Sequence, residues 1–129
     1  MAYYISKTVS HPFDKTIELV TEALAAEGFG VLAEIDVTAT MKKKLDVDFR
    51  NYRILGACNP LFAHKALEAE DKIGTMLPCN VIVQEWGENE IEVAAVDPVS
   101  SMQAVKNDEL GPVAIEIRER LARVVESLS

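Results

Sequence analysis

Two short stretches of the sequence, Cys58-Asn59-Pro60 and Leu77-Pro78-Cys79-Asn80, each place a cysteine beside a proline and an asparagine. A cysteine thiol can bind a soft metal ion or, after losing its proton, act as a nucleophile or a redox group. Asparagine and proline fix turns and start helices, so both motifs are expected where strands end, and binding sites are common there. The predicted ligand-binding residues are Cys58, Asn59, Pro60, Pro78, Cys79 and Asn80.

A metal site is the most specific hypothesis for the two thiols. Cys58 and Cys79, together with the imidazole of His64, supply three donors that suit Cu(I) or Zn(II). A fourth position could be taken by water, by a second protomer or by Met76. The spacing matches no known metal motif, and His64 shares a helical face with Glu68, which indicates that it faces water.

Two other interpretations of the cysteines stay open. The predicted helix start at Asn59-Pro60 would favour a thiolate at Cys58 through its free amides and dipole, as a redox or nucleophilic role requires, although no Cys-x-x-Cys pair is present. Alternatively, both cysteines fill space at the edge of the core, which is the commonest behaviour of this residue.

No other signature of catalysis is present in the sequence. It has no glycine-rich phosphate loop with its lysine and no nucleophile elbow, and neither His11 nor His64 has a serine arrangement that suggests a triad. Whether the chain is an enzyme is left open, and a non-enzymatic domain is favoured. No cofactor is identified.

The elements that position these motifs follow from hydrophobic periodicity. Alternating or continuous apolar runs predict five strands, at 3–9, 31–37, 52–58, 79–86 and 91–96. Gly56 predicts a bulge or a close backbone approach in the third strand. The turn Gly87-Glu88-Asn89 predicts that the last two strands form an antiparallel hairpin.

Helical spacing predicts a first helix that starts near Ser10 and Pro12 and ends at Gly28. Shorter helices are expected over 38–45 and 61–70, then a loop from Asp71 to Leu77, and a long final helix over about 108–128. These elements favour an α+β fold with a mostly antiparallel five-stranded sheet, helices packed on one face, and the order β-α-β-β-β-β-α with short helices between strands. No repeat or linker divides the chain, so one domain over 1–129 is expected.

The composition and charge of the sequence disfavour two classes of binding partner, nucleic acids and membranes. The net charge of −8 repels nucleic-acid phosphates, and the cluster Lys42-Lys43-Lys44 is typical of a solvated helix face. No signal peptide and no membrane-spanning stretch are recognised, and two cysteines are too few for a disulfide framework. We therefore expect a cytoplasmic protein that binds neither nucleic acid nor membrane. Aromatic residues on strands are usually buried, so a core position is expected for Tyr3, Tyr4, Tyr52 and Trp86, with a pocket or an oligomer interface as the alternative.

Several stretches of the sequence resemble the family known as domain of unknown function 302. These stretches are Gly28-Phe29, Glu34 to Val37, Tyr52 to Pro60, Ala63, Ala66-Leu67 and Leu77 to Val83. The resemblance covers nearly the whole chain. It implies a fold similar to the TATA-binding-protein-like class and a homodimer, and it implies no activity.

Three functions are therefore carried forward. The first is a binding domain that takes a metal ion or small ligand near Cys58 and Cys79. The second is a thiol-dependent redox protein or enzyme that uses one of these cysteines. The third is a structural or interaction module that acts through a homodimer surface.

Overall fold

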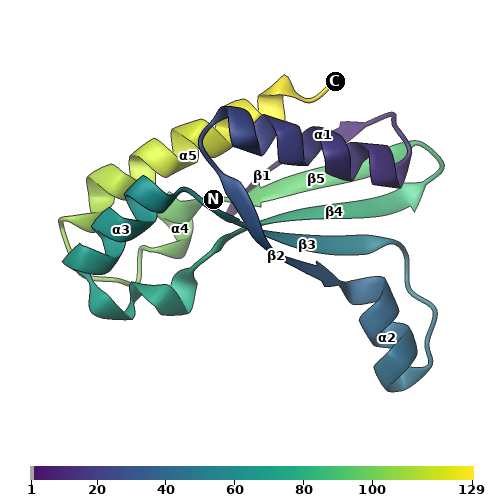
Figure 1. Ribbon diagram of the computed structural model, residues 1–129, viewed down its shortest axis with the longest axis horizontal. Helices are drawn as coiled ribbons and strands as arrows, with labels where there is room; N and C mark the ends of the chain where they lie inside the picture. Colours follow the sequence, from purple (N-terminus) through teal and green to yellow (C-terminus); the bar gives the residue numbers. More distant parts are fainter. Residues whose placement is uncertain (1) are drawn as a thin grey trace.

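Five antiparallel strands form one sheet in the computed structural model, which describes residues 2–129. The strands are β1 (Tyr4–Val9), β2 (Gly30–Asp36), β3 (Tyr52–Cys58), β4 (Cys79–Gly87) and β5 (Glu90–Val96). Their order across the sheet is β1-β5-β4-β3-β2, and every neighbouring pair is antiparallel (Figure 1). The predicted fold class and the β4–β5 hairpin are confirmed.

Two long helices, α1 (Phe13–Ala26) and α5 (Leu110–Ser127), lie across the same face of the sheet (Figure 1). Each turns an apolar stripe toward the strands, because its large apolar residues recur every three or four positions. Val20 and Leu24 of α1 and Leu121 of α5 are completely buried there against inward-facing strand residues such as Val83 and Val93. We call this cluster the central core.

The remaining helical elements are short. They are α2 (Val37–Leu45), α3 (Pro60–Ala69), the 3₁₀ helix η1 (Asp71–Met76) and α4 (Pro98–Ser101). Helix α2 projects from the edge of the sheet and has no buried residue, whereas α3, η1 and α4 gather at the opposite end (Figure 1). There Ala66, Ile73 and Leu110 form a second, smaller apolar cluster, which we call the end cluster. None of the helices in residues 2–129 combines the length and apolar character needed to cross a membrane.

Three local predictions are wrong in detail. Ser10 does not cap α1, whose N-cap position is occupied by Pro12, and no side chain caps this helix. The stretch predicted as a loop from Asp71 to Leu77 folds as η1, because short i to i+3 turns leave no apolar periodicity to detect. Helix α4 was not predicted, although Asp97 caps it by accepting hydrogen bonds from the amides of Val99 and Ser100 at 2.9 and 3.4 Å.

Gly56 provides the close approach predicted in the third strand. A Cβ atom at this position would lie 2.7 Å from Cγ of Pro78 at the start of β4, nearer than real side chains pack. The adjacent strand β2 shifts its register between Val31 and Ala33, opposite Gly56. The bulge thus lies in β2, and the glycine allows Pro78 to lie across the third strand.

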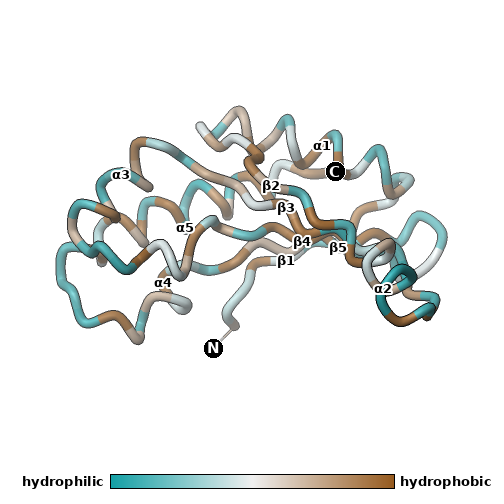
Figure 2. Tube along the Cα trace, turned by 60° about the horizontal axis from the view of Figure 1, so that its bottom comes forward, coloured by the Kyte–Doolittle hydropathy of each residue, from teal (hydrophilic) through white to brown (hydrophobic). Residues whose placement is uncertain are grey.

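The second face of the sheet is covered by no helix of residues 2–129 (Figure 2). The residues that alternate outward on the strands form this open face, and it includes Ile35, Tyr52, Ile54, Ile82 and Ala94. The core position expected for the strand aromatics is therefore wrong for Tyr3, Tyr4 and Trp86, which are 70%, 43% and 58% exposed. These side chains belong to the side of the sheet that α1 and α5 leave free.

Candidate functional site

A pocket of about 310 Å³ lies where the central core meets the end cluster, and we call it the end pocket. Its floor is the adjoining ends of β3 and β4, and its walls come from α3, η1 and α5, with Pro98 of α4 closing one side. Asn59 is the only lining residue with a side chain that is neither apolar nor a cysteine. The end pocket is therefore an apolar site formed by elements far apart in the sequence.

Small residues on facing elements leave this space open. Helix α3 turns Ala63 and Ala66 toward the end pocket, α5 contributes Ala114, and Gly74 of η1 contributes no side chain. Larger residues at these positions would interdigitate, as they do in the central core. The pocket therefore depends on small residues at four positions, which lie on three elements.

The two cysteines lie together at the floor of the end pocket. Cys79 begins β4 and pairs in register with Ala57, next to Cys58 at the end of β3. Burial raises the pKa of the Cys79 thiol to about 11, and the neighbouring Cys58 adds to the increase. At neutral pH the Cys79 thiol is therefore protonated, a weak nucleophile, and lines the pocket as an apolar group.

Four of the predicted ligand-binding residues meet at the end pocket, namely Cys58, Asn59, Pro78 and Cys79. The other two do not line it. Pro60 occupies the first position of α3, where its ring serves the helix start. Asn80 follows Cys79 along β4 and therefore points to the open face, since successive side chains of a strand alternate.

The predicted metal set of Cys58, Cys79 and His64 is not assembled. His64 lies on the outer side of α3, where its side chain is 75% exposed and its Nε2 lies 3.3 Å from Oε1 of Glu68. Met76 does not line the end pocket either. Within residues 2–129, no group of three or more His, Cys, Asp or Glu side chains is placed to hold a metal ion.

Asn59 has a role that differs from the predicted helix cap. Its side chain makes no cap hydrogen bond to α3, and its Nδ2 instead lies 3.4 Å from the backbone oxygen of Glu27. The same oxygen accepts a hydrogen bond from Nη1 of Arg120 at 3.1 Å. Next to it, Gly28 adopts a left-handed conformation with φ of 86°, so Asn59 and Arg120 together hold the turn between α1 and β2.

Most residues that form the walls of the end pocket could not be identified from the sequence. Phe62, Ala114 and Ile117 line it but carry no chemical signature, and only the fold brings α3 beside α5. The available signal was the pair Ala63 and Ala66, small residues on one side of a short helix. Their spacing indicates a close approach or a space, without indicating which.

Comparison with known proteins gives a family and a fold. The sequence model of the family described as "Domain of unknown function DUF302" matches residues 5–128. The chain is also similar to a solved structure, the crystal structure of uncharacterized conserved protein DUF302 from Bacillus stearothermophilus. The two share 29% sequence identity and a TM-score of 0.90, and the match covers 98% of each chain. No match is found among curated proteins.

Proposed function

Since the chain belongs to the DUF302 family, a family of unknown function, we propose from its structure that the domain binds a small apolar molecule in the end pocket. Binding is non-covalent, with Cys58 and Cys79 as part of the pocket floor. This is the small-ligand form of the binding-domain hypothesis. The outward-facing position of His64, and the absence from residues 2–129 of a group of three potential metal ligands, argue against its metal form.

The single observation that carries the proposal is an apolar pocket of about 310 Å³ that is partly open to solvent, since its lining residues Leu32 and Leu67 are 72% and 44% exposed. Concave and mostly apolar surfaces of this kind are typical of small-molecule sites, and an apolar ligand that covers one removes it from water. Water in the pocket finds few hydrogen-bond partners, because Asn59 provides the only polar side chain of the lining. The volume is at the lower end of the roughly 300–1,000 Å³ typical of ligand pockets, which favours a small ligand.

Binding of a neutral apolar dye, N-phenyl-1-naphthylamine, tests this function. We expect saturable fluorescence enhancement with the wild-type protein and its loss in Ala63→Leu, because the larger side chain fills the end pocket. The matched control is Ala25→Leu on the exposed side of α1, which should bind the dye as the wild type does. Absence of saturable binding to the wild type, or equal binding by both variants, would contradict the proposal.

A second candidate function is an interaction module, and the open face of the sheet favours it. Apolar side chains run across this face from Ile35 through Ile54 and Ile82 to Ala94, in register on four strands. An antiparallel sheet can expose one face to water, but its outward residues are then mostly polar. A continuous apolar row of this kind is typical of a protein interface.

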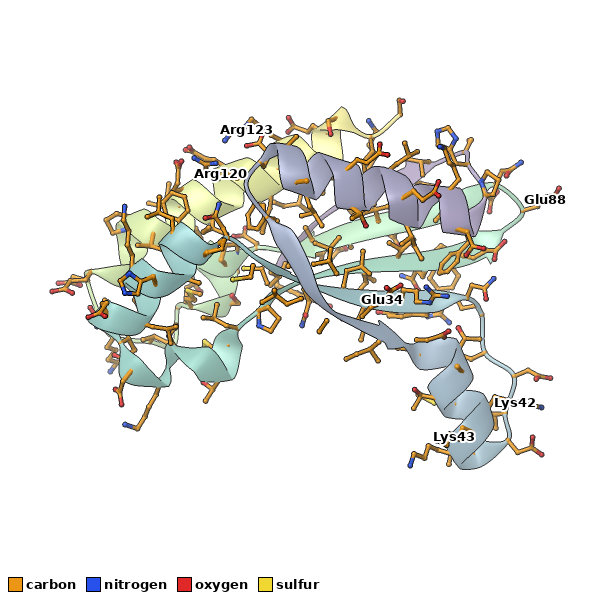
Figure 3. All side chains as sticks on the ribbon, viewed as in Figure 1. Glu34, Lys42, Lys43, Glu88, Arg120 and Arg123 are labelled. Atoms are coloured by element: carbon orange, nitrogen blue, oxygen red, sulfur yellow. The ribbon has the colours of Figure 1, made fainter. Side chains whose placement is uncertain are left out.

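We propose a second copy of the chain as the partner on this face. The charges at this end of the molecule have opposite signs, because α2 carries Lys43, whereas the β4–β5 turn, which is separate from α2 at the same end, carries Glu88 (Figures 1 and 3). Two copies related by a two-fold axis can bring each basic helix to the other's acidic turn. Oligomers are most often symmetric dimers of this type.

Sedimentation velocity of two lysine variants tests the second candidate. Ile35 on the open face and Ile115 on α5 are 50% and 53% exposed, so they are matched positions on different surfaces. We expect a dimer for the wild type and for Ile115→Lys, and a monomer for Ile35→Lys. A monomeric wild type, or a dimeric Ile35→Lys, would exclude this interface.

A further inference from the structure

Asn59 has the one polar side chain in the lining of the end pocket, and it is buried, with 8% of its surface exposed. The other lining residues are apolar or cysteine, and none of them is charged. Thiols are weak hydrogen-bond partners. Hydrogen bonding between a ligand in the end pocket and the protein side chains therefore depends mainly on this amide.

The turn between α1 and β2 determines which way the Asn59 amide points. Nδ2 lies 3.4 Å from the backbone oxygen of Glu27, and because a carbonyl oxygen only accepts hydrogen bonds, the NH₂ end of the amide must face it. The geometry at Gly28 agrees, since a Cβ atom there would lie 3.0 Å from Nδ2 of Asn59 but 3.8 Å from its Cγ. Oδ1 is on the other branch of the amide, and it therefore faces away from the turn.

Oδ1 of Asn59 accepts no hydrogen bond from residues 2–129, where Nδ2 makes the only hydrogen bond of this side chain. Within the same residues, no buried side-chain nitrogen or oxygen atom lacks a partner, so Oδ1 is not enclosed by protein. It must border open space, and the open space that Asn59 lines is the end pocket. Oδ1 is thus a free acceptor among apolar groups, where an unmade hydrogen bond is costly.

We propose that the end pocket binds an uncharged, mostly apolar molecule that donates one hydrogen bond, from a hydroxyl or N–H group, to Oδ1 of Asn59. This inference rests on the proposed apolar-ligand function and names the class of its ligand. A charged group inside the pocket is disfavoured, because no lining side chain carries a compensating charge. At the opening, the exposed residues Leu32 and Leu67 continue the apolar lining to the surface.

Competition by matched pairs of small molecules tests the inference. Indole and para-cresol each have one hydrogen-bond donor, whereas benzofuran and para-xylene have the same shapes without it. Each is titrated against bound N-phenyl-1-naphthylamine, and the affinity ratio within a pair does not depend on how tightly the dye itself binds. An apolar pocket without an acceptor would favour benzofuran and para-xylene, because it leaves the donor of the other member unpaired.

We expect the wild type to bind the donor-bearing member of each pair at least as tightly as its partner. Asn59→Leu should shift both ratios by about three- to tenfold toward the partner, the range of one net hydrogen bond between neutral groups. An unchanged ratio in Asn59→Leu would overturn the inference.

Arg120→Met separates ligand recognition from support of the turn. Nη1 of Arg120 donates to the same Glu27 oxygen at 3.1 Å, but Arg120 does not line the end pocket, and Figure 3 shows it on α5 beside the end of α1. This variant should keep the wild-type ratios. A preference for donors that is lost equally in Arg120→Met and Asn59→Leu would mean that the turn, and not Oδ1, determines it.

The possible failures are distinguishable. If the dye binds but the wild type favours benzofuran and para-xylene, the ligand class is wrong and the apolar site stands. If the dye does not bind the wild type, the proposed function fails and the inference fails with it. Circular dichroism follows the folding of both variants, and the wild-type ratios decide alone if Asn59→Leu unfolds.

Discussion

The central core and the end cluster are both apolar and buried, yet they are packed differently. In the central core, long side chains from α1, α5 and the sheet interdigitate, so that Leu24, Val83 and Leu121 have no exposed surface. In the end cluster, short elements meet through alanine and glycine, and a pocket of about 310 Å³ remains beside Ile73 and its neighbours. The same chain thus builds a stabilising region and a region with space for a ligand, and side-chain size distinguishes them.

Matched truncations of two buried isoleucines should give the largest effect. Ile91 in the central core and Ile73 in the end cluster are 0% and 1% exposed. We expect Ile91→Ala to lower the free energy of unfolding by about 4 kcal/mol and Ile73→Ala by about 2 kcal/mol, because short elements beside a pocket relax more completely into a new cavity. Urea unfolding of both variants measures the difference. Equal losses would mean that the end cluster is packed as rigidly as the central core.

The Cys79 thiol gives the next largest effect, as a dependence of stability on pH. Its pKa is about 11 in the folded protein and about 9.0 when the chain is unfolded and solvated, so above about pH 9 the unfolded state loses a proton that the folded state keeps. Folding stability should therefore fall as pH rises between these values, by about 2 kcal/mol at about pH 10.5.

The control for this pH effect is Cys79→Ala, which retains every other titrating group. Urea unfolding at neutral pH and at about pH 10.5 gives the loss of stability for each protein, and the wild type should lose about 2 kcal/mol more than the variant. If both lose the same amount, the thiol is better solvated than its position on the floor of the end pocket indicates.

A smaller effect is expected from adding one methyl group at Gly56. A Cβ there meets Cγ of Pro78 at 2.7 Å, so Gly56→Ala should displace a floor residue of the end pocket and cost about 1–2 kcal/mol. Gly30→Ala is the matched control on β2, since a Cβ at Gly30 meets nothing within 4 Å. It should be neutral or stabilising by about 0.5 kcal/mol. Thermal unfolding measures the stability of both variants. A Gly56→Ala variant as stable as the wild type would show that Pro78 can move to accommodate the added methyl group.

The smallest effect is expected at His64, which is close to the end cluster in sequence but faces away from it. His64→Ala removes only an exposed contact with Glu68, so the free energy of unfolding should change by less than about 0.5 kcal/mol. Zn(II) titration followed by native mass spectrometry should give the same uptake for this variant as for the wild type. A specific loss of bound zinc in His64→Ala would restore the metal hypothesis.

The fold could be predicted from the sequence wherever one face of an element is buried. Strand β3 was predicted with the bounds it has, and the β4–β5 hairpin followed from its turn residues. Periodicity could not show that the sheet has only one covered face, so Trp86 was placed on the wrong side. The TATA-binding-protein-like class and the homodimer remain predictions from the family resemblance.

The candidate site was only half predictable. The cysteine motifs mark strand ends, which are local features of the sequence, and four of the predicted ligand-binding residues line the end pocket, whereas ligand binding there stays a prediction. The walls are formed by α3 and α5, which are distant in sequence. Local sequence patterns do not predict which faces of two such helices pack against each other. The role of Asn59 was missed for the same reason, since its partner Glu27 lies at the end of another helix.

The strand order β1-β5-β4-β3-β2 also bears on how the chain folds as it is synthesised. Among the described residues, β1 pairs with β5 alone, four strands later in chain order, and α1 packs against α5 as well as against β2 and β4. Such long-range pairing slows folding and leaves early apolar segments exposed. During synthesis β1 and α1 therefore emerge before β5 and α5, and we expect the domain to become resistant to protease only once α5 can pack against α1 and the sheet.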